Sequence, residues 1–187
     1  MSIPLLCQAA HSQLLIIDVQ QRLADTMDRD VLAALVRHTG ILIEAANALH
    51  IPVLHTEQYP RGLGPTLPAL ADKLTAEQGA CEKTGFSCCA APGMNARFND
   101  AVRTQIILTG MEAHICVLQT AIELQQRGKT VFVVVDAVCS RSKHNFKNAI
   151  ARLRQAGCII TNTESVLFEW LGDAQHPQFK ALSKLIR

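Results

Sequence analysis

The feature that most constrains the fold is a regular alternation of short apolar runs with longer segments of helical periodicity. The apolar runs lie at 14–19, 51–56, 80–83, 104–110, 130–137 and 158–161. Nearly continuous apolar strands separated by helices indicate a parallel sheet that is covered on both faces. Because parallel crossovers are right-handed, the sequence predicts an α/β fold, a three-layer α/β/α, doubly wound, Rossmann-like sheet of six parallel strands.

Helical periodicity fills the segments between these strands. We expect helices at about 28–50, 67–74, 114–126 and 143–155, and two short helices at about 163–170 and 177–186. The stretch 57–68 contains three prolines and two glycines and is predicted to be a loop. The sequence shows no internal repeat or linker, so residues 1–187 are predicted to form a single domain.

Composition narrows the classes of function. Charged residues make up only 18% of the chain, against roughly a quarter in ordinary soluble proteins, which favours a homo-oligomer with part of the surface covered. The net charge is +2 and the basic residues are scattered, so no nucleic-acid partner is predicted. The continuous apolar runs are too short to span a membrane, and the N-terminal segment lacks the basic region of a signal peptide.

The seven cysteines are odd in number and have no CxxC spacing. Without an export signal, this pattern favours free thiols in a reducing compartment, and we expect a cytoplasmic protein. Metal sites need clustered ligands at short spacing, and the segment after the second strand supplies none. A lone histidine such as His55 is more often a hydrogen-bonded core residue than a ligand. The sequence therefore predicts no metal and no other cofactor.

Three polar residues stand where predicted strands end. Asp18 stands at the carboxyl end of the first strand, Lys83 at the end of the third, and Cys116 just past the fourth, in the first turn of the next helix. Ligands of doubly wound sheets bind beyond the carboxyl ends of the strands, and we expect these three strands near the centre of the sheet. Amides at a helix N-terminus stabilise a thiolate, which favours Cys116 as nucleophile, with Asp18 as its base and Lys83 as an electrostatic helper.

Each of the three residues also has a simpler structural interpretation. Asp18 can cap a helix or serve as a structural acceptor, a lysine such as Lys83 is most often solvated, and a free cysteine is most often a small buried hydrophobe. Two other function classes stay open. One is a non-catalytic interaction or scaffold protein on the same fold, and the other is a thiol redox sensor that uses Cys116, with Cys139 as the thiol able to approach it in space.

At this point the sequence resembles the isochorismatase-like hydrolases, also called cysteine hydrolases. The matching pieces are LLIIDVQ at 14–20, EKTGFS at 82–87, TGMEAHICVLQTAIEL at 109–124 and DAVCSRS at 136–142, in the family's order and spacing. The stretch TEQYPRGLG at 56–64 is similar to the isochorismatase domain-containing branch of this family.

The resemblance implies a catalytic triad in which Asp18 is the base, Lys83 the stabiliser and Cys116 the nucleophile. It also implies a cis peptide bond between Met111 and Glu112. Next to that bond, the backbone amides of Glu112 and Cys116 are implied to form an oxyanion hole.

The chain departs from two named activities of the family. Metal-dependent nicotinamidases place an aspartate and histidines where this chain has 57–60, EQYP, and isochorismatases proper lack the cysteine that this chain keeps as Cys116. We therefore expect metal-independent acyl transfer to water from a small amide-like or related carbonyl substrate, through a thioester. Gln58, Tyr59 and Phe86 are candidates for the substrate pocket because of their loops.

Overall fold

The computed structural model describes residues 5–187, in which six strands form one parallel sheet in the order β3-β2-β1-β4-β5-β6. The strands are β1 (Ser12–Ile17), β2 (Val53–Gln58), β3 (Cys81–Lys83), β4 (Gln105–Met111), β5 (Thr130–Cys139) and β6 (Ile159–Thr161). This arrangement confirms the predicted α/β, doubly wound fold. The chain changes winding direction between β1 and β4, the point at which such sheets bind ligands.

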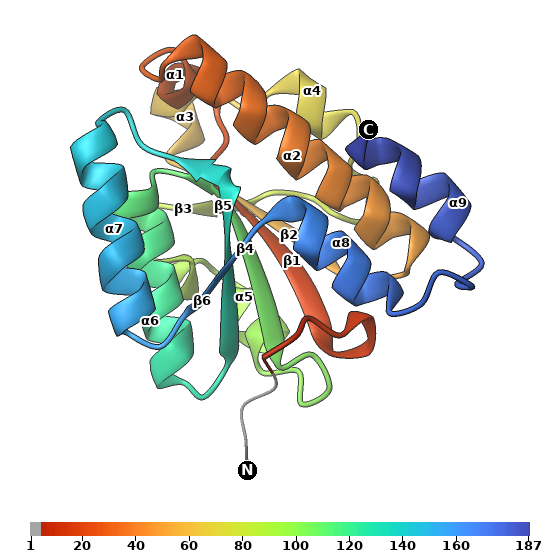
Figure 1. Ribbon diagram of the computed structural model, residues 1–187. Helices are drawn as coiled ribbons and strands as arrows, with labels where there is room; N and C mark the ends of the chain where they lie inside the picture. The colour runs from red at the N-terminus through yellow and green to blue at the C-terminus, as the bar shows by residue number, and fades with distance from the viewer. Residues whose placement is uncertain (1–4) are drawn as a thin grey trace.

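Helices cover both faces of the sheet (Figure 1). One face carries α2 (Arg29–Ala48) and α8 (Thr163–Leu171), and the other carries α6 (Leu118–Gln126) and α7 (Lys143–Gln155). The shorter elements are α1 (Gln21–Ala24), α3 (Pro60–Leu63), α4 (Pro68–Ala71), α5 (Met94–Phe98), α9 (Phe179–Leu182), the 3-10 turns η1 (Ala9–His11), η2 (Cys88–Ala90) and η4 (Ser183–Ile186), and the π-helix η3 (Ala113–Val117).

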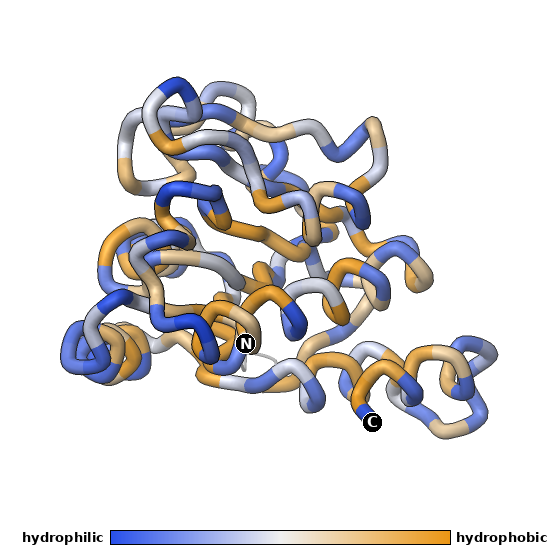
Figure 2. The backbone as a smooth tube through the Cα atoms, turned by 90° about the horizontal axis from the view of Figure 1, so that it is seen from above, coloured by the Kyte–Doolittle hydropathy of each residue, from blue (hydrophilic) through white to orange (hydrophobic). Residues whose placement is uncertain are grey.

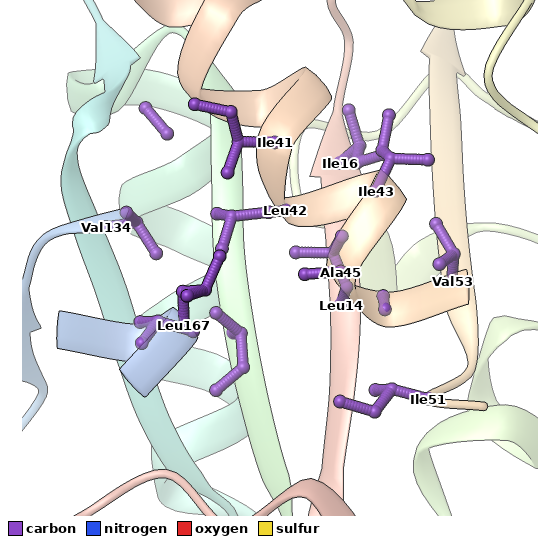
Figure 3. Close-up of a cluster of buried hydrophobic side chains, with 14 of the residues drawn as sticks. Leu14, Ile16, Ile41, Leu42, Ile43, Ala45, Ile51, Val53, Val134 and Leu167 are labelled. Carbon is purple, nitrogen blue, oxygen red and sulfur yellow. The ribbon is translucent and has the colours of Figure 1, made fainter. Parts of the chain in front are cut away.

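The sheet divides the core into two apolar clusters, one on each face. Every residue of β1 and β4 is buried, which explains why their sequences are continuous apolar runs and do not alternate. Figure 3 shows Leu42 of α2 between Val134 of β5 and Leu14 of β1, and Ile43 of α2 beside Ile16 of β1. In Figure 2 the outer helices alternate between hydrophobic and hydrophilic residues, as expected when only one side of a helix is buried.

Within residues 5–187, α2 is the helix with the length and composition of a membrane span, with a mean hydropathy of 1.2. The sequence shows no continuous apolar run there, because Arg37, His38 and Glu44 interrupt it. In the structure α2 packs on β5 and α8 and has eight buried residues. Its role in the fold is therefore that of a core helix. The helix begins at Asp28, whose carboxylate accepts the amides of the first turn.

Several expectations about the elements need correction. The predicted loop at 57–68 begins with the last two residues of β2, because these pair with Glu82 and Lys83 of β3, and it contains α3. The helix predicted at 67–74 is only the single turn of α4. The third strand lies at the edge of the sheet and not near its centre, because β2 is inserted between β3 and β1.

Gly110 allows β1 and β4 to approach each other directly below the candidate site. Its φ is +110°, and a Cβ added there would lie 2.1 Å from the carbonyl oxygen of Ile17. The register of β4 against β5 also shifts between Leu108 and Gly110. Any larger residue must therefore push apart the two strands whose carboxyl ends form the site.

We predict that Gly110→Ala lowers the free energy of unfolding by at least about 3 kcal/mol, since it combines overpacking with an unfavourable φ. The control is Gly128→Ala, where φ is +79° but no atom lies within 4 Å of the added Cβ. That variant should lose only about 1–2 kcal/mol. Urea unfolding of both variants checks the prediction, and equal losses would contradict it.

Candidate active site

Asp18 and Lys83 form a buried ion pair at the carboxyl end of the sheet. Asp18 directly follows β1 with φ 51°, and its amide donates to the carbonyl oxygen of Thr56. The distance from its Oδ2 to Lys83 Nζ is 2.7 Å, and both side chains are fully buried. The structural interpretations from sequence, a helix cap and a solvated lysine, are therefore wrong for this pair.

Lys83 lies on the edge strand β3 and extends past the end of β2 to reach Asp18. Its ammonium also donates to Gln58 Oε1 at 2.7 Å and to the carbonyl oxygens of Phe86 at 3.1 Å and Gly85 at 3.3 Å. Burial lowers the pKa of Lys83, but the charge of Asp18, reinforced by the nearby thiols, outweighs it, so the net pKa is raised. Lys83 is therefore a permanent cation at neutral pH.

Thr56, which the sequence analysis did not single out, binds the other oxygen of the carboxylate. Its hydroxyl donates to Asp18 Oδ1 at 2.7 Å and lies 3.6 Å from the sulfur of Cys88. Thr56 is two residues before the end of β2, and Cys88 begins η2. The rule that selected Asp18, a polar residue near the carboxyl end of a strand, would also have selected Thr56.

Cys116 lies within η3, the π-helix that precedes α6, and not in the first turn of an α-helix as predicted. It is 5% exposed. Burial and then the Asp18 carboxylate raise the pKa of its thiol well above the usual range, while Lys83 lowers it. This overturns the expectation of a stabilised thiolate, so the resting thiol carries its proton at neutral pH.

The peptide bond between Met111 and Glu112 is cis, as the resemblance implied. Glu112 precedes η3, and its carbonyl oxygen accepts from the amides of Ile115 at 3.0 Å and Val117 at 3.3 Å. Its buried carboxylate accepts the amide of Arg141 at 2.9 Å. These bonds fix the turn that carries the backbone of Glu112 and Cys116.

A pocket of about 440 Å³ adjoins Lys83, although neither Asp18 nor Cys116 lines it. It is lined by Tyr59, Pro60, Arg61, Glu82, Lys83, Thr84, Ala90 and Pro92. Tyr59 lines this pocket and is 55% exposed. Gln58 instead lies in β2 and uses its amide to join Lys83 to the carbonyl oxygen of Thr84. Phe86 is exposed, and its carbonyl oxygen binds Lys83.

The described part of the chain contains no group of three or more His, Cys, Asp or Glu side chains arranged to hold a metal ion. All seven cysteines are free thiols, and Cys116 is accompanied at the ion pair by Cys88, not by Cys139. The site is thus composed of one buried carboxylate, one buried ammonium and two thiols. Such a set can deprotonate a nucleophile and stabilise negative charge.

The chain is similar to known proteins in sequence and in structure. The sequence profile of the Isochorismatase domain matches residues 12–165. Isochorismatase domain-containing protein 2 from Danio rerio is 39% identical over 176 residues, which cover 94% of this chain and 86% of that protein. The structure of the MAR1 ribonuclease from Caenorhabditis elegans is 38% identical, with a TM-score of 0.90, over 96% of this chain and 91% of that one.

A more distant structure shares the fold. An Escherichia coli protein described as an octameric hydrolase of unknown specificity has a TM-score of 0.80 at 21% identity, over 100% of this chain and 91% of that one. From the profile match and the relatives near 40% identity, this chain belongs to the isochorismatase family of hydrolases, as its motifs predicted.

We predict that Lys83→Met lowers the free energy of unfolding by about 3–5 kcal/mol, because it leaves the Asp18 charge buried without a partner. The control is the double variant Asp18→Asn with Lys83→Met, which removes both charges and should lose markedly less. Urea unfolding at pH 7 measures both values. A double variant no more stable than the single one would show that the charge pair is not the stabilising feature.

Proposed function

We propose that the protein is a cysteine hydrolase that transfers the acyl group of a small amide-like or related carbonyl substrate to water. The observation that carries this proposal is the fully buried Asp18–Lys83 pair with the Cys116 thiol beside it. A binding or scaffold protein gains nothing from two buried charges that cost several kcal/mol each to desolvate. A nucleophile with an adjacent base and a cation uses all three groups.

In the first step the Cys116 thiol gives its proton to Asp18 as the sulfur attacks the substrate carbonyl carbon. A resting thiol with a raised pKa needs such a base, because little thiolate is present at neutral pH. The tetrahedral intermediate expels the amine, which takes the proton from Asp18, and a thioester remains on Cys116. Water then attacks the thioester, Asp18 receives the proton of that water and returns it to the sulfur, and the acid is released.

Two groups offset the negative charge of these steps. The Lys83 ammonium stabilises the developing thiolate and the transition state, since it lowers the pKa of Cys116. We assign the oxyanion hole to the backbone amides of Glu112 and Cys116, because η3 places both in one turn after β4. Loss of one such donor is worth roughly 3 to 4 kcal/mol in related sites.

A small substrate fits the site better than a polymer. Cys116 is 5% exposed and Asp18 is fully buried, and the pocket that adjoins Lys83 measures about 440 Å³. The name ribonuclease borne by the Caenorhabditis elegans relative makes RNA hydrolysis the second candidate. A ribonuclease assay on the wild-type protein and on Cys116→Ala separates the two, because thiol-dependent acyl transfer gives no route to phosphodiester cleavage.

The remaining proposals concern the domain organisation, location, metal requirement, oligomeric state and partners of the enzyme. We propose a single-domain, cytoplasmic, metal-independent homo-oligomer that binds neither nucleic acid nor membrane. The low charge content and the octameric Escherichia coli relative support self-association. The free thiols and the lack of clustered ligands in residues 5–187 support a reducing compartment and a reaction without metal.

The experiment that tests the function is a turnover screen across small primary amides and related carbonyl compounds. Release of ammonia or acid should be seen with at least one of them and should disappear in Cys116→Ala. The control is Cys158→Ala, which removes another buried thiol that lies away from the ion pair. Activity that survives in Cys116→Ala would exclude the proposed nucleophile.

We further predict opposite effects of Asp18→Asn on two properties of the site. Turnover should fall by roughly a hundredfold or more, because the general base is lost. The pKa of Cys116 should drop, since the carboxylate beside it raises that pKa, so alkylation of Cys116 by iodoacetamide at pH 8 should become faster. Peptide mapping gives the alkylation rate. Unchanged turnover in the folded variant would remove Asp18 from the mechanism.

A further inference from the structure

We propose that Thr56 is a positioning residue that aims the Asp18 carboxylate at Cys116, and that the buried thiol of Cys88 holds Thr56 in the required orientation. The inference rests on the proposed function, because Asp18 acts there as the base. It assigns roles to a threonine and a second cysteine that take no direct part in the chemistry.

Donors from β2 and β3 hold the Asp18 carboxylate. Asp18 Oδ1 lies 2.7 Å from the Thr56 hydroxyl, and its Oδ2 lies 2.7 Å from Lys83 Nζ. An ionised carboxylate only accepts, so the single hydroxyl proton of Thr56 points at Oδ1. Each carboxylate oxygen thus has one donor from β2 or β3, which fixes the carboxylate plane from two sides, and the Cys116 thiol is a further hydrogen-bond partner of Asp18.

The sulfur of Cys88 lies 3.6 Å from the same hydroxyl. Since the proton of Thr56 is committed to Asp18, Cys88 must be the donor in its contact with Thr56. The chain of donors runs from the Cys88 thiol to the Thr56 hydroxyl and on to the Asp18 carboxylate. Burial, followed by the charge of Asp18, raises the pKa of Cys88 to about 12, so this thiol keeps its proton at neutral pH.

Cys88 is itself anchored in the core. Its side chain is completely buried, and its amide donates to the hydroxyl of Thr120 at 2.9 Å. Thr120 lies on α6, four residues and about one helical turn after Cys116. Cys88 is therefore fixed to the element that follows the nucleophile, while its thiol orients the residue that holds the base. The contacts around Cys88 therefore help to position both Cys116, which gives the proton, and Asp18, which receives it.

The Thr56 hydroxyl also affects the titration of the thiol beside the carboxylate. The titratable groups that interact with the carboxylate are Lys83 from β3, Cys88 from η2 and Cys116 from η3. The Thr56 hydroxyl stabilises the negative forms of the Asp18–Cys116 pair. Without this donor, the negative charge beside the Cys116 thiol is less well stabilised, so the thiol holds its proton more tightly.

The experiment compares Thr56→Val, Thr56→Ser and Thr109→Val. Thr56→Val should lower kcat roughly ten- to hundredfold and move the acidic limb of kcat/KM about one pH unit higher. Thr56→Ser keeps the hydroxyl donor and should therefore restore most of kcat and most of the position of the acidic limb. Thr109 is a buried threonine of β4, on the other side of β1 from Thr56, and its hydroxyl has no partner among the described residues. Thr109→Val is therefore the matched control and should change neither.

A second pair of variants tests the role of Cys88. Cys88→Ala removes the donor to Thr56 and should lower kcat about three- to tenfold, with a smaller shift of the acidic limb in the same direction. Cys88→Ser keeps a hydroxyl donor and should behave like the wild type. Equal losses in the two variants would show that Cys88 only fills space.

Alkylation of Cys116 by iodoacetamide gives a readout that does not need a substrate. In Thr56→Val the alkylation rate at pH 8 should fall about threefold or more, whereas Thr109→Val should leave it unchanged. If Cys116→Ala retains turnover, the proposed function fails, and the alkylation rate still decides the role of Thr56. A Thr56→Val alkylation rate that matches Thr109→Val, or a loss of melting temperature without any change in that rate, would overturn the inference.

Discussion

The buried ion pair between Lys83 Nζ and Asp18 Oδ2, 2.7 Å apart at the carboxyl end of the sheet, determines the arrangement of the site. Desolvation of the two charges is repaid only if their remaining hydrogen-bonding capacity is also satisfied. The side-chain oxygen of Gln58 and the carbonyl oxygen of Phe86 accept hydrogen bonds from Lys83, and Thr56 donates one to Asp18. Each of these residues is therefore constrained by the pair, whatever its part in substrate binding.

The same pair explains why the order of strands matters to the chemistry. Lys83 comes from an edge strand, and β2 lies between it and Asp18. β2 consequently supplies two of the bridging groups, Thr56 and Gln58, from alternate positions of one strand. Gly110 then lets β4 approach β1 closely enough for Cys116 to lie beside the carboxylate.

The sequence was sufficient to predict the strands, the fold class and the three polar residues at the strand ends, because these depend on local periodicity and on motifs. It did not predict the edge position of β3 or the contact of Cys88 with Thr56, because both depend on which distant segments become neighbours. The direction of the Cys116 pKa shift was also missed. A helix position is visible in sequence, whereas burial beside Asp18 is a tertiary property.

The most direct test of the central claim, a buried carboxylate that deprotonates Cys116 for attack, is acid-quenched mass spectrometry during turnover. Wild-type protein mixed with an accepted substrate and quenched in acid should carry one acyl group, and peptide mapping should place it on Cys116 as a thioester that hydroxylamine removes. The same adduct should be absent when Asp18→Asn is quenched at equal times. Acylation of another residue, or turnover with no adduct on Cys116 even under single-turnover conditions, would contradict the account.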